Sequence, residues 1–457
     1  MKKFLICLIM FTLVFCGCVN NPGGGTSASD QPQSSGIEKP EEQETISIGA
    51  EKYILGIGTS KQMEIDLENA ENPVFSSDNE SVASVSPIGV ITGVAPGSAK
   101  ITVSAQSTLE AGKKISAEAA VSVNPAGYDA LLGDEAGIKW LGRTFYHKNA
   151  VNCYNTASGF EIAFYGTRVT ARIIAAGDLT PRIAVMIDGK KAKSAQILEL
   201  TKVKEEKEYV LADNLTEGEH VLRVCKITEP YTTSMGIKSI MTDGYLLEPE
   251  DKELKIEVYG DSITTGHKNM RTTASEPADS TDNIQNGCLT YAYLASEALD
   301  ADINFMARVG IGLYSAWGRP FVLKDNWKKT YLSEYDFLYG GVNPDWDFKK
   351  YIPDAVIVNI GTNDVWYDWN IDTYEDELKK FIDGLFEVYG ENTTIVIAGG
   401  MMTSDNLPVA SAVAKKYASG RVGVIELERS AANHPRVREN EDSAELLTDY
   451  LRRIIKK

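Results

Sequence analysis

The sequence predicts a multidomain protein in which two β-sandwich regions precede an α/β domain with a parallel sheet flanked by helices. Three observations support this fold class. With 457 residues, the chain is too long for one ordinary hydrophobic core. Its first half contains short β-branched runs separated by glycine and proline turns. After about residue 252, apolar strands alternate with helical patterns, which is typical of a parallel sheet covered by helices.

Composition argues against several classes of protein. A formal net charge of −18 disfavours a nucleic-acid partner, which would favour a basic face. Only Cys153, Cys225 and Cys288 follow the N-terminal segment, and no pair of them has a metal-ligand spacing such as CxxC. We expect three buried free thiols, with a Cys153–Cys225 disulfide as the alternative, and no metal site or cofactor.

The N-terminus has the features of an export signal. Two lysines precede an apolar run over residues 4–15, which is shorter than the ~20 residues that a membrane-spanning helix needs. The run ends at FCGC, which resembles a bacterial lipoprotein cleavage site, although Phe15 stands where leucine is usual. The resemblance implies a signal peptide over 1–18, lipidation of Cys18 and a location at the bacterial cell surface or outside the cell. Residues 19–44, rich in Gly, Ser, Pro, Gln and Glu, are predicted to form a flexible linker.

Residues 45–124 are predicted to form a β-sandwich. The stretch VFSSDNESVASVSPIGVITGVAPGSAKITVSA, from Val74 to Ala105, alternates β-branched residues with Pro and Gly turns. Its V-A-x-V, G-V-I-T and G-x-A-x-I-T patterns resemble the bacterial Ig-like domain of group 2. The segment holds no cluster of titratable groups, so we interpret it as a spacer or adhesive module.

Residues 126–248 are predicted to form a second sandwich, of jelly-roll type. Their apolar residues recur with the period of two that a half-buried strand requires. This alternation is clearest at Phe160, Ile162 and Phe164, at Ile183, Val185 and Ile187, and at His220, Leu222 and Val224. Asp188-Gly189 follows the second of these runs and predicts a hairpin turn.

Residues 252–457 are predicted to form the α/β domain. Strands are expected at 255–259 and 302–307, and DAVIVNIG (354–361) has the continuous apolar character of a strand buried on both faces. Thr373 with Asp376 resembles a capping box at the start of a helix. Ligands of such sheets bind at the carboxyl ends of the strands, where KIEVYGDSITTG delivers Ser262.

Several familiar motifs are missing around this serine. Gly260 and Gly266 do not have the spacing of a P-loop, and His267 follows instead of lysine. The nucleophile elbow GxSxG and the metal-binding HExxH do not occur in the chain. A plain helix cap is the structural alternative for Ser262.

A nucleophilic serine needs a general base and donors for an oxyanion. Among the four histidines, His434 follows the apolar strand VGVIEL, so its loop should open at the same sheet edge as Ser262. His267 is expected to point elsewhere. For the oxyanion, the donors would be the Ser262 N–H, the Gly310 N–H and the Asn363 side-chain amide, each at the end of a predicted strand.

These four blocks resemble the SGNH (GDSL-type) hydrolase superfamily: GDSIT, a glycine at 310, GTND at 361–364, and a late histidine. The β-rich segment in front, GRTFYHKNAVNCYNTASGFEIAFYGTRVTA, is similar to the N-terminal domain of carbohydrate esterase family two. The resemblance covers about 126–457. It implies an acetyl xylan esterase-like deacetylase of polysaccharides such as xylan or glucomannan, with Ser262, Gly310, Asn363 and His434 in those roles and no cofactor.

One position departs from the superfamily pattern. The Asp that orients the histidine from three residues upstream is replaced by Ala431. In trypsin-like triads, loss of that carboxylate lowers kcat by roughly 10⁴. Some members of family two are held to work with a serine–histidine pair and a backbone carbonyl in place of the carboxylate. We therefore predict a Ser262–His434 dyad, with Glu428 as the alternative partner of the histidine.

Two further groups of residues lie near the motifs. Trp366, three residues past Asn363, is the candidate for stacking on a sugar ring, whereas most of the tryptophans between 317 and 369 are expected to pack an irregular insertion. Asp261 and Asp364 are expected to hold loops by hydrogen bonds. Two other functions remain open at this point: a lipid or thioester hydrolase of the same superfamily, and a surface glycan-binding protein with an inactive site.

Overall fold

The computed structural model describes residues 43–455, apart from 134–136, 202, 273–283, 319, 391, 419 and 431–433. The predicted signal peptide, Cys18 and nearly all of the predicted linker therefore lie outside the described residues. In the described part of the chain, no helix is both long and apolar enough to cross a membrane.

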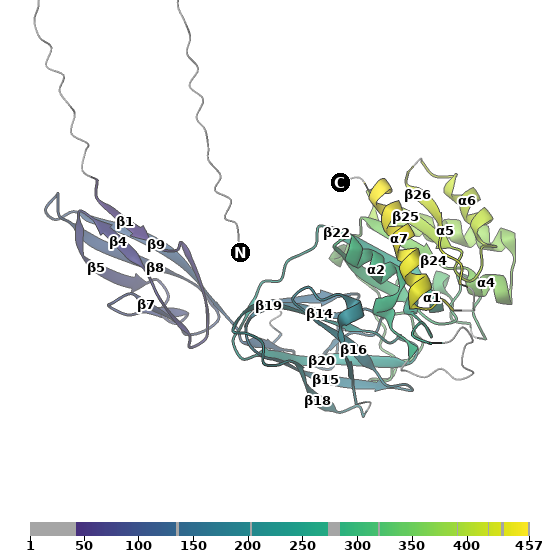
Figure 1. Cartoon of the computed structure of the whole chain (residues 1–457), viewed down its shortest axis with the longest axis horizontal. Helices are drawn as coiled ribbons and strands as arrows, with labels where there is room; N and C mark the ends of the chain where they lie inside the picture. The colour runs from purple at the N-terminus through teal and green to yellow at the C-terminus, as the bar shows by residue number, and fades with distance from the viewer. Residues whose placement is uncertain are drawn as a thin grey trace, which may run out of the picture. The chain divides into compact units, whose positions relative to one another are not determined.

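The first folded region is a small β-sandwich (Figure 1). It combines sheets of strand order β2-β9-β8-β5 and β3-β7-β6 with the pair β1-β4. Alternate residues of β8 and β9, among them Ile101, Val103 and Val121, are buried in its core, as the alternation of the sequence predicted. The strands are β1 (Thr45–Ile48), β2 (Lys52–Gly56), β3 (Ser60–Gln62), β4 (Ile65–Glu68), β5 (Ala70–Ser77), β6 (Ala83–Val85), β7 (Val90–Gly93), β8 (Gly97–Ser107) and β9 (Lys114–Asn124).

The second region is the expected antiparallel sandwich. Its sheets have the orders β12-β13-β20-β15-β18, with β10 on β20, and β11-β14-β19-β16-β17, with β21 on β14. Asp188 and Gly189 both have positive φ, +52° and +74°, as the predicted turn requires. The elements are β10 (Gly127–Asp129), β11 (Ile138–Leu141), β12 (Phe145–Tyr146), β13 (Val151–Asn152), β14 (Gly159–Gly166), β15 (Val169–Gly177), β16 (Arg182–Ile187), η1 (Ala192–Ser194), β17 (Gln196–Glu199), β18 (Glu206–Ala212), β19 (Gly218–Lys226), β20 (Thr233–Thr242) and β21 (Tyr245–Leu247).

The third region is an α/β domain whose sheet has the order β23-β22-β24-β25-β26, with every pair parallel. The fold class predicted from the sequence is thus confirmed. The elements are β22 (Leu254–Gly260), α1 (Ser262–Thr265), η3 (Gly287–Leu289), α2 (Tyr291–Ala298), β23 (Ala301–Ala307), α3 (Leu323–Asn326), η4 (Phe348–Lys350), β24 (Ala355–Asn359), α4 (Thr362–Tyr367), α5 (Ile371–Tyr389), β25 (Thr394–Gly399), α6 (Leu407–Ala414), β26 (Val422–Glu426) and α7 (Val437–Ile454).

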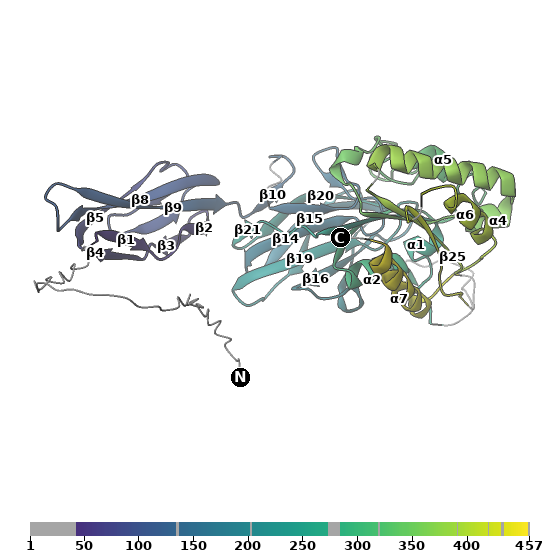
Figure 2. The ribbon, with the colours of Figure 1, turned by 90° about the horizontal axis from the view of Figure 1, so that it is seen from above.

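Helices cover both faces of this sheet, with α5 on one side and α2 and α7 on the other (Figure 2). Successive side chains of β22 point to opposite faces of the sheet. Val258 packs in the apolar core on the α2 and α7 side, and Tyr259 packs in the core on the α5 side. The expected capping box of α5 is wrong. The helix begins earlier, at Ile371, and Asn370 is its N-cap, accepting a hydrogen bond from the Thr373 N–H at 2.9 Å.

A buried arginine joins the jelly-roll and α/β domains. Arg143, in the loop after β11, is fully buried and donates to the Glu257 carboxylate of β22 at 3.0 Å. The same guanidinium donates to the carbonyl oxygens of Trp327 and Lys329 at 2.9 and 2.8 Å. A single apolar cluster also spans both domains, since Cys225 of β19 belongs to it together with residues of β22 and α2. The two domains therefore share one core.

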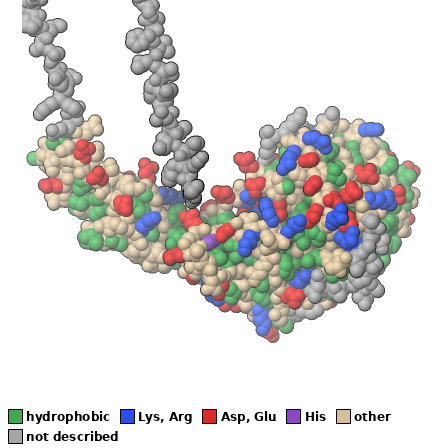
Figure 3. Space-filling model, in the orientation of Figure 1, with side chains coloured by type: hydrophobic (Ala, Val, Ile, Leu, Met, Phe, Trp, Pro, Cys, Tyr) green, Lys and Arg blue, Asp and Glu red, His purple; other side chains and the backbone are tan. Residues whose placement is uncertain are grey.

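The three described cysteines are free and buried, as expected for Cys153, Cys225 and Cys288. The alternative Cys153–Cys225 disulfide is therefore wrong. On the face of the α/β domain that Figure 3 shows, acidic and basic side chains are interspersed.

Candidate active site

Ser262 stands where strand β22 turns into helix α1, at the carboxyl edge of the sheet. The turn is tight: a Cβ on Gly260 would lie 2.0 Å from Thr264 Oγ1, so the position requires glycine. Asp261 is the N-cap and accepts from the Ile263 N–H at 2.9 Å. Ser262 is the first residue of the helix, where the backbone N–H has no intrahelical acceptor.

His434 lies between β26 and α7, and its Nε2 is 2.8 Å from the Ser262 Oγ. This is the separation at which a histidine takes a proton from a serine hydroxyl. The backbone carbonyl of His434 accepts from the Arg271 guanidinium and, at 3.4 Å, from the Ser430 hydroxyl. These contacts fix the position of the histidine backbone beside Ser262.

The expectation that His267 points away from the site is wrong. Its ring packs edge-on against the His434 ring, with 4.8 Å between the ring centroids and 70° between the planes. Helix α1 is a single turn that ends at Gly266, with φ +76°, so the chain reverses and brings His267 back beside the serine. A longer helix would have carried the His267 ring away from the serine.

Sheet order determines where the other two predicted residues lie. Strand β22 is flanked by β23 and β24, so the loops that follow those strands lie on either side of Ser262. Gly310 comes three residues after β23 with φ +75°, and Asn363 lies in the first turn of α4. The Asn363 side-chain amide donates to the Ile311 carbonyl at 2.8 Å, which joins the two loops. Its second N–H is left for another acceptor.

Asp261 and Asp364 hold loops, as expected. Asp364 is fully buried and accepts from the N–H groups of Leu313, Tyr314 and Ser315 at 2.8, 2.9 and 2.9 Å. Burial raises the pKa of Asp364, and these N–H donors oppose the shift. Burial also raises the pKa of Asp261 to about 7, against the hydrogen bonds from Ile263 and Thr362. Both carboxyls thus shape the loops that carry the candidate site residues.

Ala431, the position of the missing carboxylate, lies outside the described residues. Glu428, the alternative partner of the histidine, is exposed. Its described hydrogen bond runs from its backbone N–H to Ser443 Oγ at 3.1 Å, and within the described residues its carboxylate makes none to His434. Glu428 as a stand-in is therefore wrong.

Two tryptophans at the edge of the site are exposed. Trp366, on α4, is 47% exposed, and Trp317 is 57% exposed. Trp317 was not singled out from the sequence, yet its N–H donates to the Gly310 carbonyl at 2.8 Å. Trp327 and Trp369 instead pack against Phe381 and Tyr374, as expected for an irregular insertion. Among the described residues, no group of three or more His, Cys, Asp or Glu side chains could hold a metal ion.

Comparisons with known proteins support the resemblance seen in the sequence. Residues 140–249 match the family model described as carbohydrate esterase 2 N-terminal, and residues 44–115 match the bacterial Ig-like domain (group 2). Among curated proteins, the chain is 31% identical over 240 residues to cellulase/esterase CelE of Acetivibrio thermocellus. It is 28% identical over 195 residues to an acetylxylan esterase/glucomannan deacetylase of Cellvibrio japonicus. These matches cover 50% and 41% of this chain but only 27% and 52% of those relatives.

Solved structures match over more of their length. A family two carbohydrate esterase from Clostridium thermocellum, solved in complex with cellohexaose, is 25% identical, with a TM-score of 0.61. The match covers 69% of this chain and 98% of that one. A family two carbohydrate esterase from Cellvibrio japonicus, at 23% identity and a TM-score of 0.61, shares the fold over 72% of this chain and 97% of its own.

Proposed function

We propose that this chain, a relative of the family two carbohydrate esterases that carries a bacterial Ig-like domain of group 2, is an extracellular carbohydrate O-acetyl esterase. Its substrates would be acetylated polysaccharides such as xylan or glucomannan. The observation that carries the proposal is the 2.8 Å hydrogen bond between His434 Nε2 and Ser262 Oγ at the carboxyl edge of the sheet. The acetylxylan esterase and glucomannan deacetylase activity of one relative supports the substrate class.

In the proposed mechanism, His434 removes the proton from Ser262 as its Oγ attacks the acetyl carbonyl carbon. The carbonyl oxygen becomes negative and accepts hydrogen bonds from the N–H groups of Ser262 and Gly310 and from the Asn363 amide. The tetrahedral intermediate breaks its bond to the sugar oxygen, which takes the proton from His434 and leaves as the alcohol. Water, deprotonated by His434, then attacks the acetyl-serine and releases acetate, and the proton returns to Ser262.

Three further parts of the proposal rest on the sequence and on exposure. Trp366, which is half exposed on α4, would stack on a sugar ring of the polymer. Cys18 would carry a lipid that anchors the protein at the bacterial cell surface. The Ig-like region would act as a spacer between that anchor and the catalytic part.

The test is acetate release from acetylated xylan, acetylated glucomannan and long-chain esters. The parent protein should release acetate from the polysaccharides and show no preference for acyl chains beyond about four carbons. Ser262→Ala should abolish release, and Asn363→Ala should lower kcat by about 10² to 10³. A Trp327→Phe variant, in a tryptophan that packs against Phe381 in the core, serves as the control. A preference for long acyl chains would instead support a lipid hydrolase, and unchanged turnover in Asn363→Ala would contradict the proposed oxyanion hole.

Glycan binding is a second candidate function, because the similar structure from Clostridium thermocellum holds cellohexaose. Calorimetric titration of Ser262→Ala with cellohexaose separates the two. Binding by this variant, combined with no acetate release by the parent, would favour a glycan-binding protein over an esterase.

A further inference from the structure

The loop that carries Gly310 is anchored from two sides. Strand β23 ends at Ala307, and the next two backbone N–H groups have partners in different domains, whereas the third has none among the described residues. The Arg308 N–H donates to the Gly260 carbonyl, just before the candidate nucleophile, at 3.3 Å. The Val309 N–H donates to the carboxylate of Glu229 at 2.9 Å. The Gly310 N–H makes no hydrogen bond to any residue that the structure describes, so it remains available to a substrate.

Glu229 belongs to the jelly-roll domain, in the connection between β19 and β20, and is 2% exposed. Its own backbone is held in place: the Glu229 carbonyl accepts from the Thr233 N–H at 3.2 Å and from the Thr233 hydroxyl at 3.0 Å. The Thr228 and Thr233 hydroxyls are themselves 2.8 Å apart. The carboxylate is therefore presented to Val309 by a closed, rigid turn.

Two buried basic side chains, Lys226 and Arg308, lie near this carboxyl group, and burial lowers the pKa of Lys226 to about 7. Burial raises the pKa of Glu229 to about 7, while the Val309 N–H, Arg308 and Lys226 oppose the shift. Lys226 is fully buried and donates to the carbonyls of Tyr154 and Thr228 at 2.9 and 2.7 Å. Arg308 packs over the Tyr231 ring at 4.6 Å and donates to both carboxylate oxygens of Glu334 at 2.8 Å.

We propose that Glu229 is a positioning residue of the esterase site: through Val309, the jelly-roll domain orients the Gly310 N–H for the oxyanion. This inference rests on the proposed function. Val309 and Gly310 are consecutive, so a peptide plane tethered at the Val309 N–H restricts the rotation of the next plane, which carries the Gly310 N–H. A preorganised donor stabilises the oxyanion without reorganising during the reaction, whereas a loose one does not.

The test compares Glu229→Ala, which removes the acceptor, with Glu229→Gln, which keeps a carbonyl oxygen for the Val309 N–H. We expect Glu229→Ala to lower kcat about 10- to 10²-fold, less than removal of a donor itself, with KM within about twofold. Glu229→Gln should restore most of the lost kcat. The backbone amides of residues 308–311 should exchange hydrogen faster in Glu229→Ala than in the parent protein.

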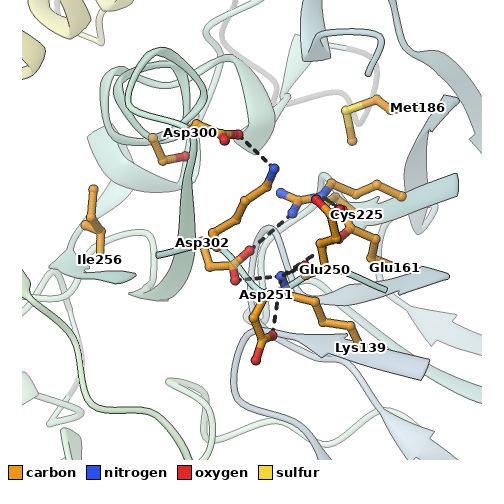
Figure 4. Close-up of polar contacts among 12 residues, drawn as sticks. Lys139, Glu161, Met186, Cys225, Glu250, Asp251, Ile256, Asp300 and Asp302 are labelled. Atoms are coloured by element: carbon orange, nitrogen blue, oxygen red, sulfur yellow. Dashed lines mark hydrogen bonds and ion pairs between the residues drawn. The ribbon is translucent and has the colours of Figure 1, made fainter. Parts of the chain in front are cut away.

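The matched control is Lys139→Met. The Lys139 side chain, on β11, is 11% exposed and contacts strand β23 at the end opposite Glu229. Its ammonium lies 2.7 Å from the Asp302 carboxylate (Figure 4). This variant should lower the Tm without lowering kcat. The inference is overturned if Glu229→Ala keeps the parent kcat or if Glu229→Gln fails to recover the lost kcat. It is also overturned if Lys139→Met lowers kcat as much as Glu229→Ala does. If the parent protein releases no acetate, the proposed function fails, and unchanged exchange of 308–311 in Glu229→Ala would separately refute the positioning role.

Discussion

Replacing Arg143 with methionine tests whether the jelly-roll and α/β domains fold as one unit. The arginine and its partner Glu257 are both fully buried, so the substitution leaves a carboxylate in the core without its counter-charge. Breaking one side of a buried ion pair costs about 3–5 kcal/mol of folding free energy. The carbonyl oxygens of Trp327 and Lys329 also lose their donor, at about 1–3 kcal/mol each where they stay dry.

Because such terms overlap, we expect Arg143→Met to lower the free energy of unfolding by about 4–6 kcal/mol in total. Urea denaturation followed by tryptophan fluorescence measures this change. The jelly-roll and α/β domains should unfold in one transition, which moves as a whole to lower urea concentration. Arg172→Met is the matched control, since Arg172 is 41% exposed in its pairs with Asp129 and Glu206. Surface pairs contribute about 0–1 kcal/mol.

A double variant, Arg143→Met with Glu257→Gln, separates the charge from the packing. Removing the unpaired carboxylate should recover part of the loss, because an uncompensated buried charge is the largest penalty. A loss below about 1 kcal/mol in Arg143→Met, equal to that of Arg172→Met, would refute the account of a shared core. A double variant that is less stable than Arg143→Met alone would also refute the account of a shared core.

Three further predictions concern the site. Trp366→Ala should raise KM for acetylated polysaccharide several-fold and leave turnover of a small aryl acetate unchanged; an equal effect on both substrates would argue against stacking. Asp364→Ala should lower the free energy of unfolding by about 2–5 kcal/mol, measured by urea denaturation, because three N–H groups, one buried and two partly buried, lose their acceptor. The pKa of Asp261, about 7 in the folded protein against an ordinary 3.8, means that the native state binds the proton more tightly than the unfolded state. The stability advantage of Asp261→Asn should therefore grow between pH 4 and 7, by up to about 1.4 kcal/mol per pH unit, and a flat difference would contradict the shift.

The sequence predicted the parts of the structure that depend on local pattern. Strand β22 and the turn at Ser262 follow from apolar alternation and from glycine at position 260. The prediction that Ser262 and His434 approach each other followed from the rule that parallel strands end at one edge of the sheet. That rule says at which edge of the sheet a residue lies, but not how the loop that carries it is folded. The 2.8 Å separation between His434 Nε2 and Ser262 Oγ depends on packing that no local sequence pattern encodes.

What the sequence could not predict are contacts that one segment makes with a distant one. Glu229 stands in a β-rich segment with no motif around it. Arg143 belongs to the segment GRTFYHKN that supports the family resemblance, but nothing in that pattern indicates its distant partner. Each residue contacts a different domain. His267 was misplaced because the length of α1 depends on Gly266, which ends the helix after a single turn. The start of α5 was misplaced because Asn370 and Thr373 are both good capping residues, and the choice between them depends on how the preceding loop packs.

The contacts between domains change how the candidate site is understood. A parallel sheet of this kind displays its site residues on the loops that follow its strands, and loops are the least rigid part of such a fold. Here the jelly-roll domain contacts two of the four strands that lead into those loops, β22 and β23. Arg143 donates to Glu257 of β22, upstream of Ser262. Glu229 accepts from the Val309 N–H just after β23, beside Gly310. A loop that is hydrogen-bonded to a second domain can stay rigid without a disulfide bond, and all described cysteines of this protein are unpaired. On the proposed role of Glu229, the jelly roll contributes to the geometry of the candidate site. Variation in its β19–β20 connection should then change turnover before it changes which polymer binds.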